Sequence, residues 1–136
     1  MTPAEKQQLF ATAKTIAVVG LSARPNRPSF DVSRIMQRAG FRIIPVNPAY
    51  AGEQILGETC MATLADVSVR IDVVNCFRRS EEMVPVARDA VALNPKPTVL
   101  WMQMGVVNAE AAQIASDAGI QVVQNQCIKI EYFASR

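Results

Sequence analysis

The chain has 136 residues, half of them hydrophobic, and its 14 basic and 12 acidic residues give a net charge of +2. This size suits one domain with its own core, and the near balance of charge argues against a nucleic-acid partner. No apolar run reaches the roughly 18 residues of a membrane-spanning helix, and the polar N-terminus is unlike a signal peptide. We therefore expect a cytoplasmic protein without a membrane partner.

Helical and extended segments alternate along the chain. The extended runs are apolar without polar alternation, which is typical of strands buried on both faces. The patterns predict five strands, at 15–20, 41–46, 71–77, 98–103 and 120–125. They predict helices at 2–14, 29–40, 80–93 and 108–119, with short helices at 62–67 and after 127. The segment 47–60 is predicted to be irregular, with room for a short edge strand.

Polar residues mark the expected starts of four of these helices. Thr2 stands before Pro3, a favoured pair for an N-cap and a first helical position. Ser29, Ser80 and Asn108 are the other expected N-caps. They stand where the helical pattern begins, so each can accept a hydrogen bond from a free amide of the first turn.

Strands that alternate with helices form parallel sheets through right-handed crossovers. We therefore expect a single α/β domain covering residues 1–136. It is predicted to be a doubly wound parallel sheet of about five strands in spatial order 2-1-3-4-5, with helices on both faces and the segment 1–14 packed on it as an N-terminal helix.

Ligands of such sheets bind beyond the carboxyl ends of the strands. The loop "GLSARPNRPS" follows the first strand, and Gly20 within it allows close backbone approach. Arg24 and Arg27 supply paired donors, Ser22 and Ser29 supply hydroxyls, and the next helix offers free amides. An ordinary solvated loop is the alternative, but this loop is longer than most such connections, which favours anion binding.

The end of the second strand reads "IIPVNP" and carries no carboxylate. An acid at this place holds the ribose hydroxyls in proteins that bind NAD, and the first loop also lacks the G-x-G-x-x-G pattern. Val46, Asn47 and Pro48 instead form a stiff, mostly apolar shelf that suits a stacked adenine.

The third and fourth strands bring further candidates to the same edge. Phe77, Arg78 and Arg79 follow the third strand, and a cation there fits a polyanionic ligand, although one of the two arginines is expected to be a surface residue. Gln103 and Gly105 follow the fourth strand within "WMQMGVVN".

These motifs resemble those of the small free-standing bacterial CoA-binding proteins, which are similar to the CoA-binding domain of the succinyl-CoA synthetase α-subunit. The resemblance rests on the first loop with "PVNP", "CFRR", "WMQMGVVN" and "CIKIEY", and it extends from about Lys14 to Tyr132. It implies a Rossmann-like sheet that holds coenzyme A. The matching positions are Gly20, Ser22, Arg27 and Ser29 for the phosphates, Val46, Asn47 and Pro48 on the adenine side, Phe77 and Arg78 after strand three, and Gln103 and Gly105 after strand four.

The resemblance also has limits. Members of this family often carry Asp-Arg before the last cysteine, where this chain has Asn125 and Gln126 before Cys127. The synthetases transfer phosphate through a histidine in a separate domain, and this chain contains no histidine. The resemblance therefore implies binding of CoA or acyl-CoA, with or without a protein partner, rather than ligation.

Catalytic and metal-binding residues are not expected. The absence of histidine excludes Ser-His-Asp and Cys-His catalysis and histidine metal sites. Cys60, Cys76 and Cys127 form no CxxC pair and no disulfide framework. The alternative function is an interaction or regulatory protein on the same scaffold that binds another adenine nucleotide or no ligand. A further hypothesis is that Cys76 or Cys127 lies at the ligand edge and forms a mixed disulfide with CoA; buried packing is the more common role of a cysteine.

Overall fold

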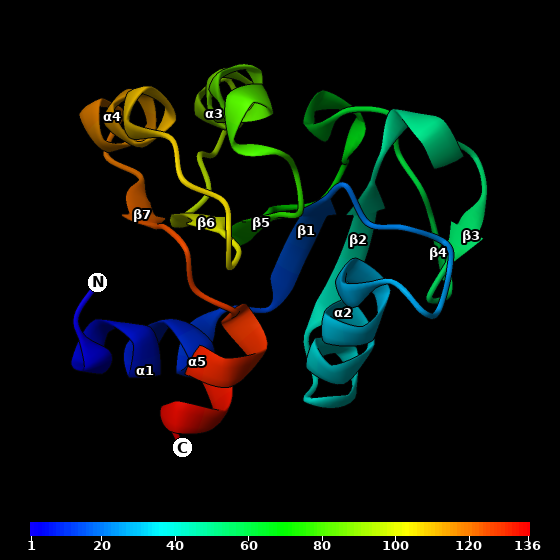
Figure 1. Ribbon diagram of the computed structural model, residues 1–136, viewed down its shortest axis with the longest axis horizontal. Coiled ribbons are helices and arrows are strands. Elements are labelled where there is room, and N and C mark those ends of the chain that lie inside the picture. Colours follow the sequence, from blue (N-terminus) through cyan, green and yellow to red (C-terminus); the bar gives the residue numbers. More distant parts are fainter.

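Five parallel strands form the centre of the computed structural model, which describes all of residues 1–136 (Figure 1). Their spatial order is β2-β1-β5-β6-β7, which confirms the predicted order of the five main strands. The sheet strands are β1 (Thr15–Val19), β2 (Arg42–Val46), β5 (Val73–Cys76), β6 (Val99–Met102) and β7 (Gln121–Val123). The α-helices are α1 (Pro3–Thr12), α2 (Pro28–Arg38), α3 (Met83–Val91), α4 (Ala109–Asp117) and α5 (Ile128–Ala134).

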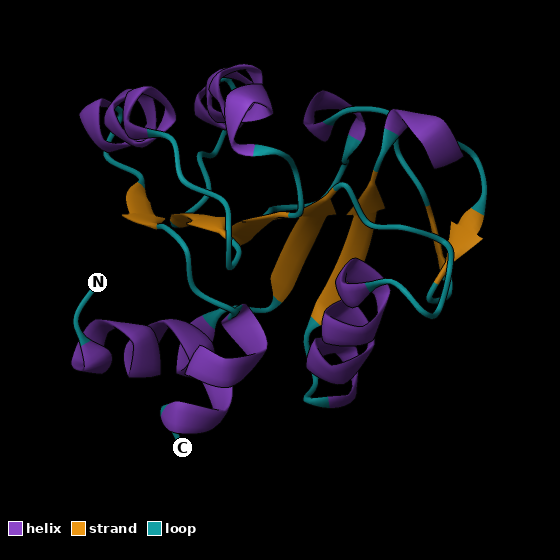
Figure 2. Ribbon diagram, viewed as in Figure 1, coloured by secondary structure: helices purple, strands orange, loops and turns teal.

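Helices cover both faces of the sheet, as predicted (Figure 2). Alternate residues of each central strand enter opposite cores, because successive side chains of a strand point to opposite faces. Val19 and its neighbours meet α3 and α4 on one face. Val18 and its neighbours meet α1, α2 and α5 on the other, together with the buried indole of Trp101. Both cores are largely apolar, with Asn75 of β5 as a buried polar exception, which explains why the strands show no regular apolar–polar alternation.

Local hydrogen bonds explain why α1 begins where it does. The Thr2 hydroxyl accepts the amide of Glu5, and the Glu5 carboxylate accepts the amide of Thr2. This reciprocal pair and Pro3 in the first turn confirm the predicted start of the helix. The predicted cap of α4 is also confirmed, because the Asn108 side chain accepts the amide of Ala111.

Two predicted helix caps are wrong. Helix α2 begins after Arg27, and the hydroxyl of Ser29 accepts the amide of Ser22 in the preceding loop instead of an amide of its own helix. Ser80 opens a 3₁₀ turn, η3 (Ser80–Glu82), and its hydroxyl accepts the amide of Val107. Both hydroxyls accept an amide from outside their own helix or turn, so neither serves as a helix cap.

The segment after β2 is more ordered than predicted. It contains the 3₁₀ turns η1 (Pro48–Tyr50) and η2 (Leu64–Asp66), where the sequence predicted irregular chain and a short helix. Between them, β3 (Gln54–Ile55) and β4 (Glu58–Thr59) pair antiparallel as a separate ribbon beside the main sheet rather than as an extra edge strand. No helix in the structure is both long enough and apolar enough to cross a membrane.

Candidate functional site

A cavity of about 700 Å³ lies at the carboxyl edge of the sheet, between the loops that follow β1, β5 and β6. We call it the arginine cavity, because four of its fifteen lining residues are arginines and none is acidic. The lining residues are Gly20, Ser22, Arg24, Arg27, Pro28, Ser29, Asn47, Tyr50, Phe77, Arg78, Arg79, Gln103, Met104, Gly105 and Val106.

The loop after β1 presents hydrogen-bond donors to this cavity. The amide of Ser22 donates to the Ser29 hydroxyl oxygen over 3.0 Å, and the amide of Arg24 donates to the Ser22 hydroxyl oxygen over 3.1 Å. Each hydroxyl therefore accepts from the backbone and keeps its own proton for a ligand. The amide of Ser29 lies in the first turn of α2 and has no backbone acceptor. A helix start with free amides favours an anion.

Three of the four arginines have no acidic partner within the protein. Arg24, Arg27 and Arg78 form no ion pair or side-chain hydrogen bond, so their guanidinium groups keep all their donors. Arg79 differs, because it is 77% exposed and pairs with Glu82 over 2.8 Å. The expectation that one arginine of the "FRR" step is a surface residue is thus confirmed, and that residue is Arg79.

A second cavity of about 450 Å³ adjoins the first and shares Arg78 with it. Its apolar lining includes Val46 and Pro48 on one side and Pro85 of α3 on the other. We call it the proline slot. Together the arginine cavity and the proline slot contain all eleven site residues that the sequence singled out, brought from four separate stretches of the chain.

The side chain of Asn47 is not free to bind a ligand, because both ends of it form hydrogen bonds within the protein. Its side-chain amide donates to the carbonyl of Leu21, and its side-chain oxygen accepts the amide of Ala49. These bonds fasten the end of β2 to the loop after β1. Asn47 therefore positions the loop, in addition to lining the cavity.

The absence of a side chain at Gly20 allows a close backbone contact within the protein, in addition to the approach of a ligand. A Cβ atom at Gly20 would lie 2.1 Å from the carbonyl oxygen of Phe77, and the backbone φ of Gly20 is +89°. The side chain of Arg78 also packs near this point. Glycine is required here because β1 and β5 end in direct contact beneath the cavity.

The loop after β6 is fastened by polar residues that sequence reasoning missed or left open. The amide of Gly105 donates to the Asn125 side-chain oxygen over 2.7 Å, and the Ser80 hydroxyl donates to the Gly105 carbonyl. Asn125 has a φ of +57°, which asparagine tolerates better than most residues. Asn125, part of the departure from the family pattern, thus holds the loop that lines the cavity. A polar residue at the end of a strand was the only sequence signal for this role.

The structure contradicts the hypothesis of a reactive Cys76. Its side chain is fully buried on the α3 side of the sheet. Burial raises the pKa of the Cys76 thiol well above its usual value, although the charge of Arg78 acts in the opposite direction. Cys127 is 8% exposed and packs in the opposite core. None of the three cysteines lines the arginine cavity or the proline slot.

We expect Cys76 to resist alkylation in the folded protein, because a buried thiol with a raised pKa is neither accessible nor ionised. Iodoacetamide treatment followed by peptide mass analysis measures this directly, with the urea-unfolded protein as the fully labelled reference. Rapid labelling of Cys76 in the folded protein would contradict the burial seen in the structure.

Comparison with known proteins found a matching family model, a similar protein and similar solved structures. A family model described as a CoA binding domain matches residues 14–133. The uncharacterized protein YneT of Bacillus subtilis (strain 168) is 41% identical over 133 residues, which are 98% of this chain and 96% of that protein. A solved structure from Thermus thermophilus has a TM-score of 0.95 at 32% identity, with both chains fully covered.

A larger protein shares only the fold. This chain superposes on 27% of a dinucleotide-forming acetyl-coenzyme A synthetase from Ca. Korarchaeum cryptofilum, with a TM-score of 0.71 at 21% identity over 88% of this chain. The family match covers nearly the whole chain, from before β1 to the end of α5. The protein therefore belongs to the CoA-binding domain family.

Proposed function

We propose that the protein binds coenzyme A or acyl-CoA at the carboxyl edge of the sheet, without catalysing a reaction. The observation that carries this proposal is the arginine cavity. Its lining contains no acid and three unpaired guanidinium groups. Arginine meets phosphate oxygens through pairs of hydrogen bonds, so such a lining favours a ligand with several phosphates.

In the proposed complex, the phosphates and the adenine of CoA lie in different cavities. The pyrophosphate lies in the arginine cavity, near Ser22, Arg27 and the first turn of α2. The adenine lies in the proline slot, against Val46 and Pro48, where an apolar wall suits a flat ring. Arg78 lines both cavities, so we assign it to the phosphates attached to the adenosine ribose.

A binding role without catalysis agrees with the lining of the arginine cavity, and the carboxylates of Glu81, Glu82 and Asp89 line the adjoining proline slot instead. The groups in the arginine cavity are donors and apolar side chains, which hold an anion but provide no general base. A regulatory protein that binds a different adenine nucleotide is the second candidate, because an adenine and phosphate site serves many nucleotides. Titration with several ligands distinguishes the two candidates.

We expect CoA to bind more tightly than NAD. Strand β2 ends without a carboxylate for the adenosine ribose hydroxyls of NAD, whereas CoA brings a third phosphate to the unpaired arginines. Isothermal titration calorimetry with each ligand measures the difference. At 100 times its dissociation constant, CoA should also raise the stability by about 2.7 kcal/mol. Tighter binding of NAD, or no binding of CoA, would contradict the proposed function.

A further inference from the structure

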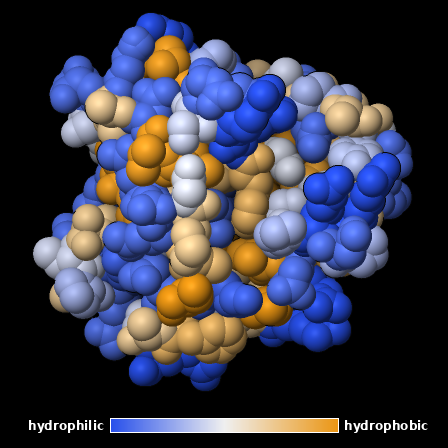
Figure 3. Space-filling model, in the orientation of Figure 1, coloured by the Kyte–Doolittle hydropathy of each residue, from blue (hydrophilic) through white to orange (hydrophobic).

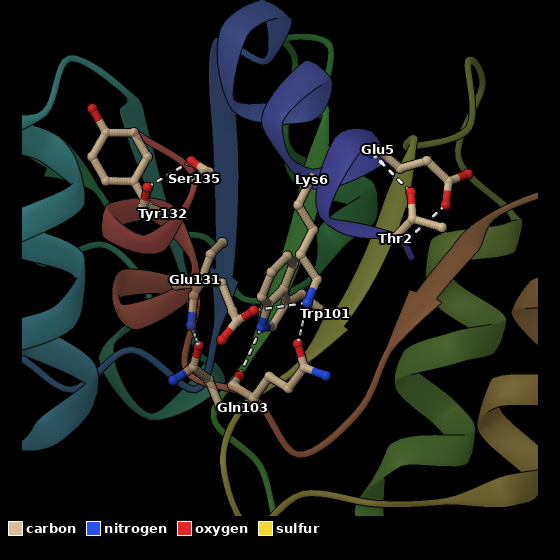
Figure 4. Close-up of polar contacts among 10 residues, drawn as sticks. Thr2, Glu5, Lys6, Trp101, Gln103, Glu131, Tyr132 and Ser135 are labelled. Atoms are coloured by element: carbon tan, nitrogen blue, oxygen red, sulfur yellow. Dashed lines mark hydrogen bonds and ion pairs between the residues drawn. The ribbon is translucent and has the colours of Figure 1, made fainter.

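Gln103 connects the arginine cavity to the last helix. It lines the cavity, yet its side chain is only 4% exposed because it lies between the cavity and α5. Its side-chain oxygen accepts the amide of Ile128, the first residue of α5, over 2.9 Å (Figure 4). The nitrogen of the same carboxamide forms no hydrogen bond within the protein and is not enclosed there. The bond to α5 therefore fixes the carboxamide with its donor end free for a ligand.

The attachment of α5 continues to the first helix. The carbonyl of Gln126 accepts the indole N–H of Trp101 over 2.8 Å, and its side-chain oxygen accepts the ammonium of Lys6 over 2.7 Å. Lys6 also pairs with Glu131 of α5 over 2.7 Å, in a partly buried position (Figure 4). Lys6 of α1 thus contacts both Gln126, just before α5, and Glu131 in the middle of α5.

Helix α5 is a short terminal element with one buried and one exposed face. Ile128 is fully buried, and the Tyr132 ring packs at right angles to Phe10 and Phe41. Ile130 and Phe133 are each 51% exposed, and Figure 3 shows apolar side chains gathered over this part of the molecule. Few elements contact this seven-residue helix, and such an element can open locally at a lower free energy than the whole domain.

We propose that docking of α5 and ligand binding in the arginine cavity stabilise each other through Gln103. This regulation rests on the proposed function, because it takes CoA as the ligand. While α5 is docked, the Gln103 carboxamide is held ready to donate to a ligand oxygen. When α5 is released, the carboxamide loses its partner and must be ordered again on binding, which costs conformational entropy. Linkage requires that CoA favours docking by the same factor by which docking favours CoA.

The test breaks the Lys6–Glu131 pair, which lies outside the cavity. Glu131→Lys places two ammonium groups together and should release α5. The double variant Lys6→Glu with Glu131→Lys restores the pair with its charges exchanged, and the Gln126 carboxamide, once rotated, can donate its N–H to the new carboxylate at position 6. Arg42→Met is the matched control, because it removes another 2.7 Å ion pair, with Glu58, that does not involve α5. Hydrogen exchange measures α5 docking, and calorimetry measures the CoA dissociation constant.

We expect Glu131→Lys to lose amide protection in α5 and to raise the CoA dissociation constant about fivefold, at the low end of usual coupling. The double variant should recover both properties, and Arg42→Met should change neither. Saturating CoA should increase α5 protection in the wild-type protein. A released α5 with wild-type affinity, or unchanged α5 protection in Glu131→Lys or with CoA, would overturn the coupling. Failure of the wild-type protein to bind CoA would instead overturn the proposed function, and the two results are distinguishable.

Discussion

The Gly20→Ala substitution should destabilise the protein by about 3 kcal/mol or more. An added Cβ would lie 2.1 Å from the Phe77 carbonyl oxygen, so the ends of β1 and β5 would have to separate. The amide of Phe77 donates to the carbonyl of Val19 over 2.9 Å and joins the end of β5 to β1, while the amide of Gly20 donates to the carbonyl of Val46 over 2.8 Å and joins β1 to β2. The φ of +89° adds strain for any residue with a side chain.

Urea unfolding of Gly20→Ala and Gly119→Ala distinguishes the effect of the close contact with Phe77 from the effect of backbone strain. Gly119 has a similar φ of +84°, but a Cβ atom there meets no atom within 4 Å. Gly119→Ala should therefore cost only about 1–2 kcal/mol, the strain of the left-handed backbone alone. Equal losses in the two variants would show that the contact with Phe77 contributes nothing.

The Arg27→Ala substitution should weaken CoA binding by about 1.5–3 kcal/mol, or roughly 10- to 150-fold. Arg27 stands at the start of α2, lines the arginine cavity and has no partner within the protein. Its removal therefore takes a charged donor from the ligand without breaking a contact of the fold. The stability of the free protein should stay nearly unchanged.

Arg38→Ala is the control for Arg27→Ala, because Arg38 lies exposed in the last turn of the same helix and outside the cavity. Calorimetry at physiological salt should show wild-type affinity for Arg38→Ala. The loss in Arg27→Ala should persist at this salt, because screening weakens distant charges more than direct hydrogen bonds. Equal affinity of the two variants would remove Arg27 from the phosphate site. We expect Arg24→Ala to have a smaller effect, because Pro25 turns the chain beside it.

The order of the sheet and the edge that carries the candidate site follow from the sequence alone. Mostly apolar runs such as "TIAVV" and "IDVVNCF" lack regular apolar–polar alternation, which is typical of strands buried on both faces, and the helices between them require parallel pairing. Parallel strands bring the loops after them to one edge. The predicted site residues, from Gly20 to Gly105, therefore lie together although 85 positions separate those two.

The tertiary structure alone decided which partner each of these residues has. The sequence does not distinguish Arg78 from Arg79, but only Arg79 forms an ion pair with Glu82 within the protein. The helix patterns predicted Ser29 and Ser80 as caps, whereas both hydroxyls accept amides from other loops. Cys76 points into a core because its position in β5 assigns it to that face.

The hydrogen bond between Gln103 and α5 could not be predicted from the sequence either. Its partner Ile128 is 25 positions away, and no local pattern relates a strand end to the amide of a later helix. Periodicity and loop chemistry are local properties, so they determine elements, their order and the edge where they meet. Hydrogen bonds and close contacts between distant segments depend on ångström-scale packing, which exists only once both layers of helices have closed on the sheet.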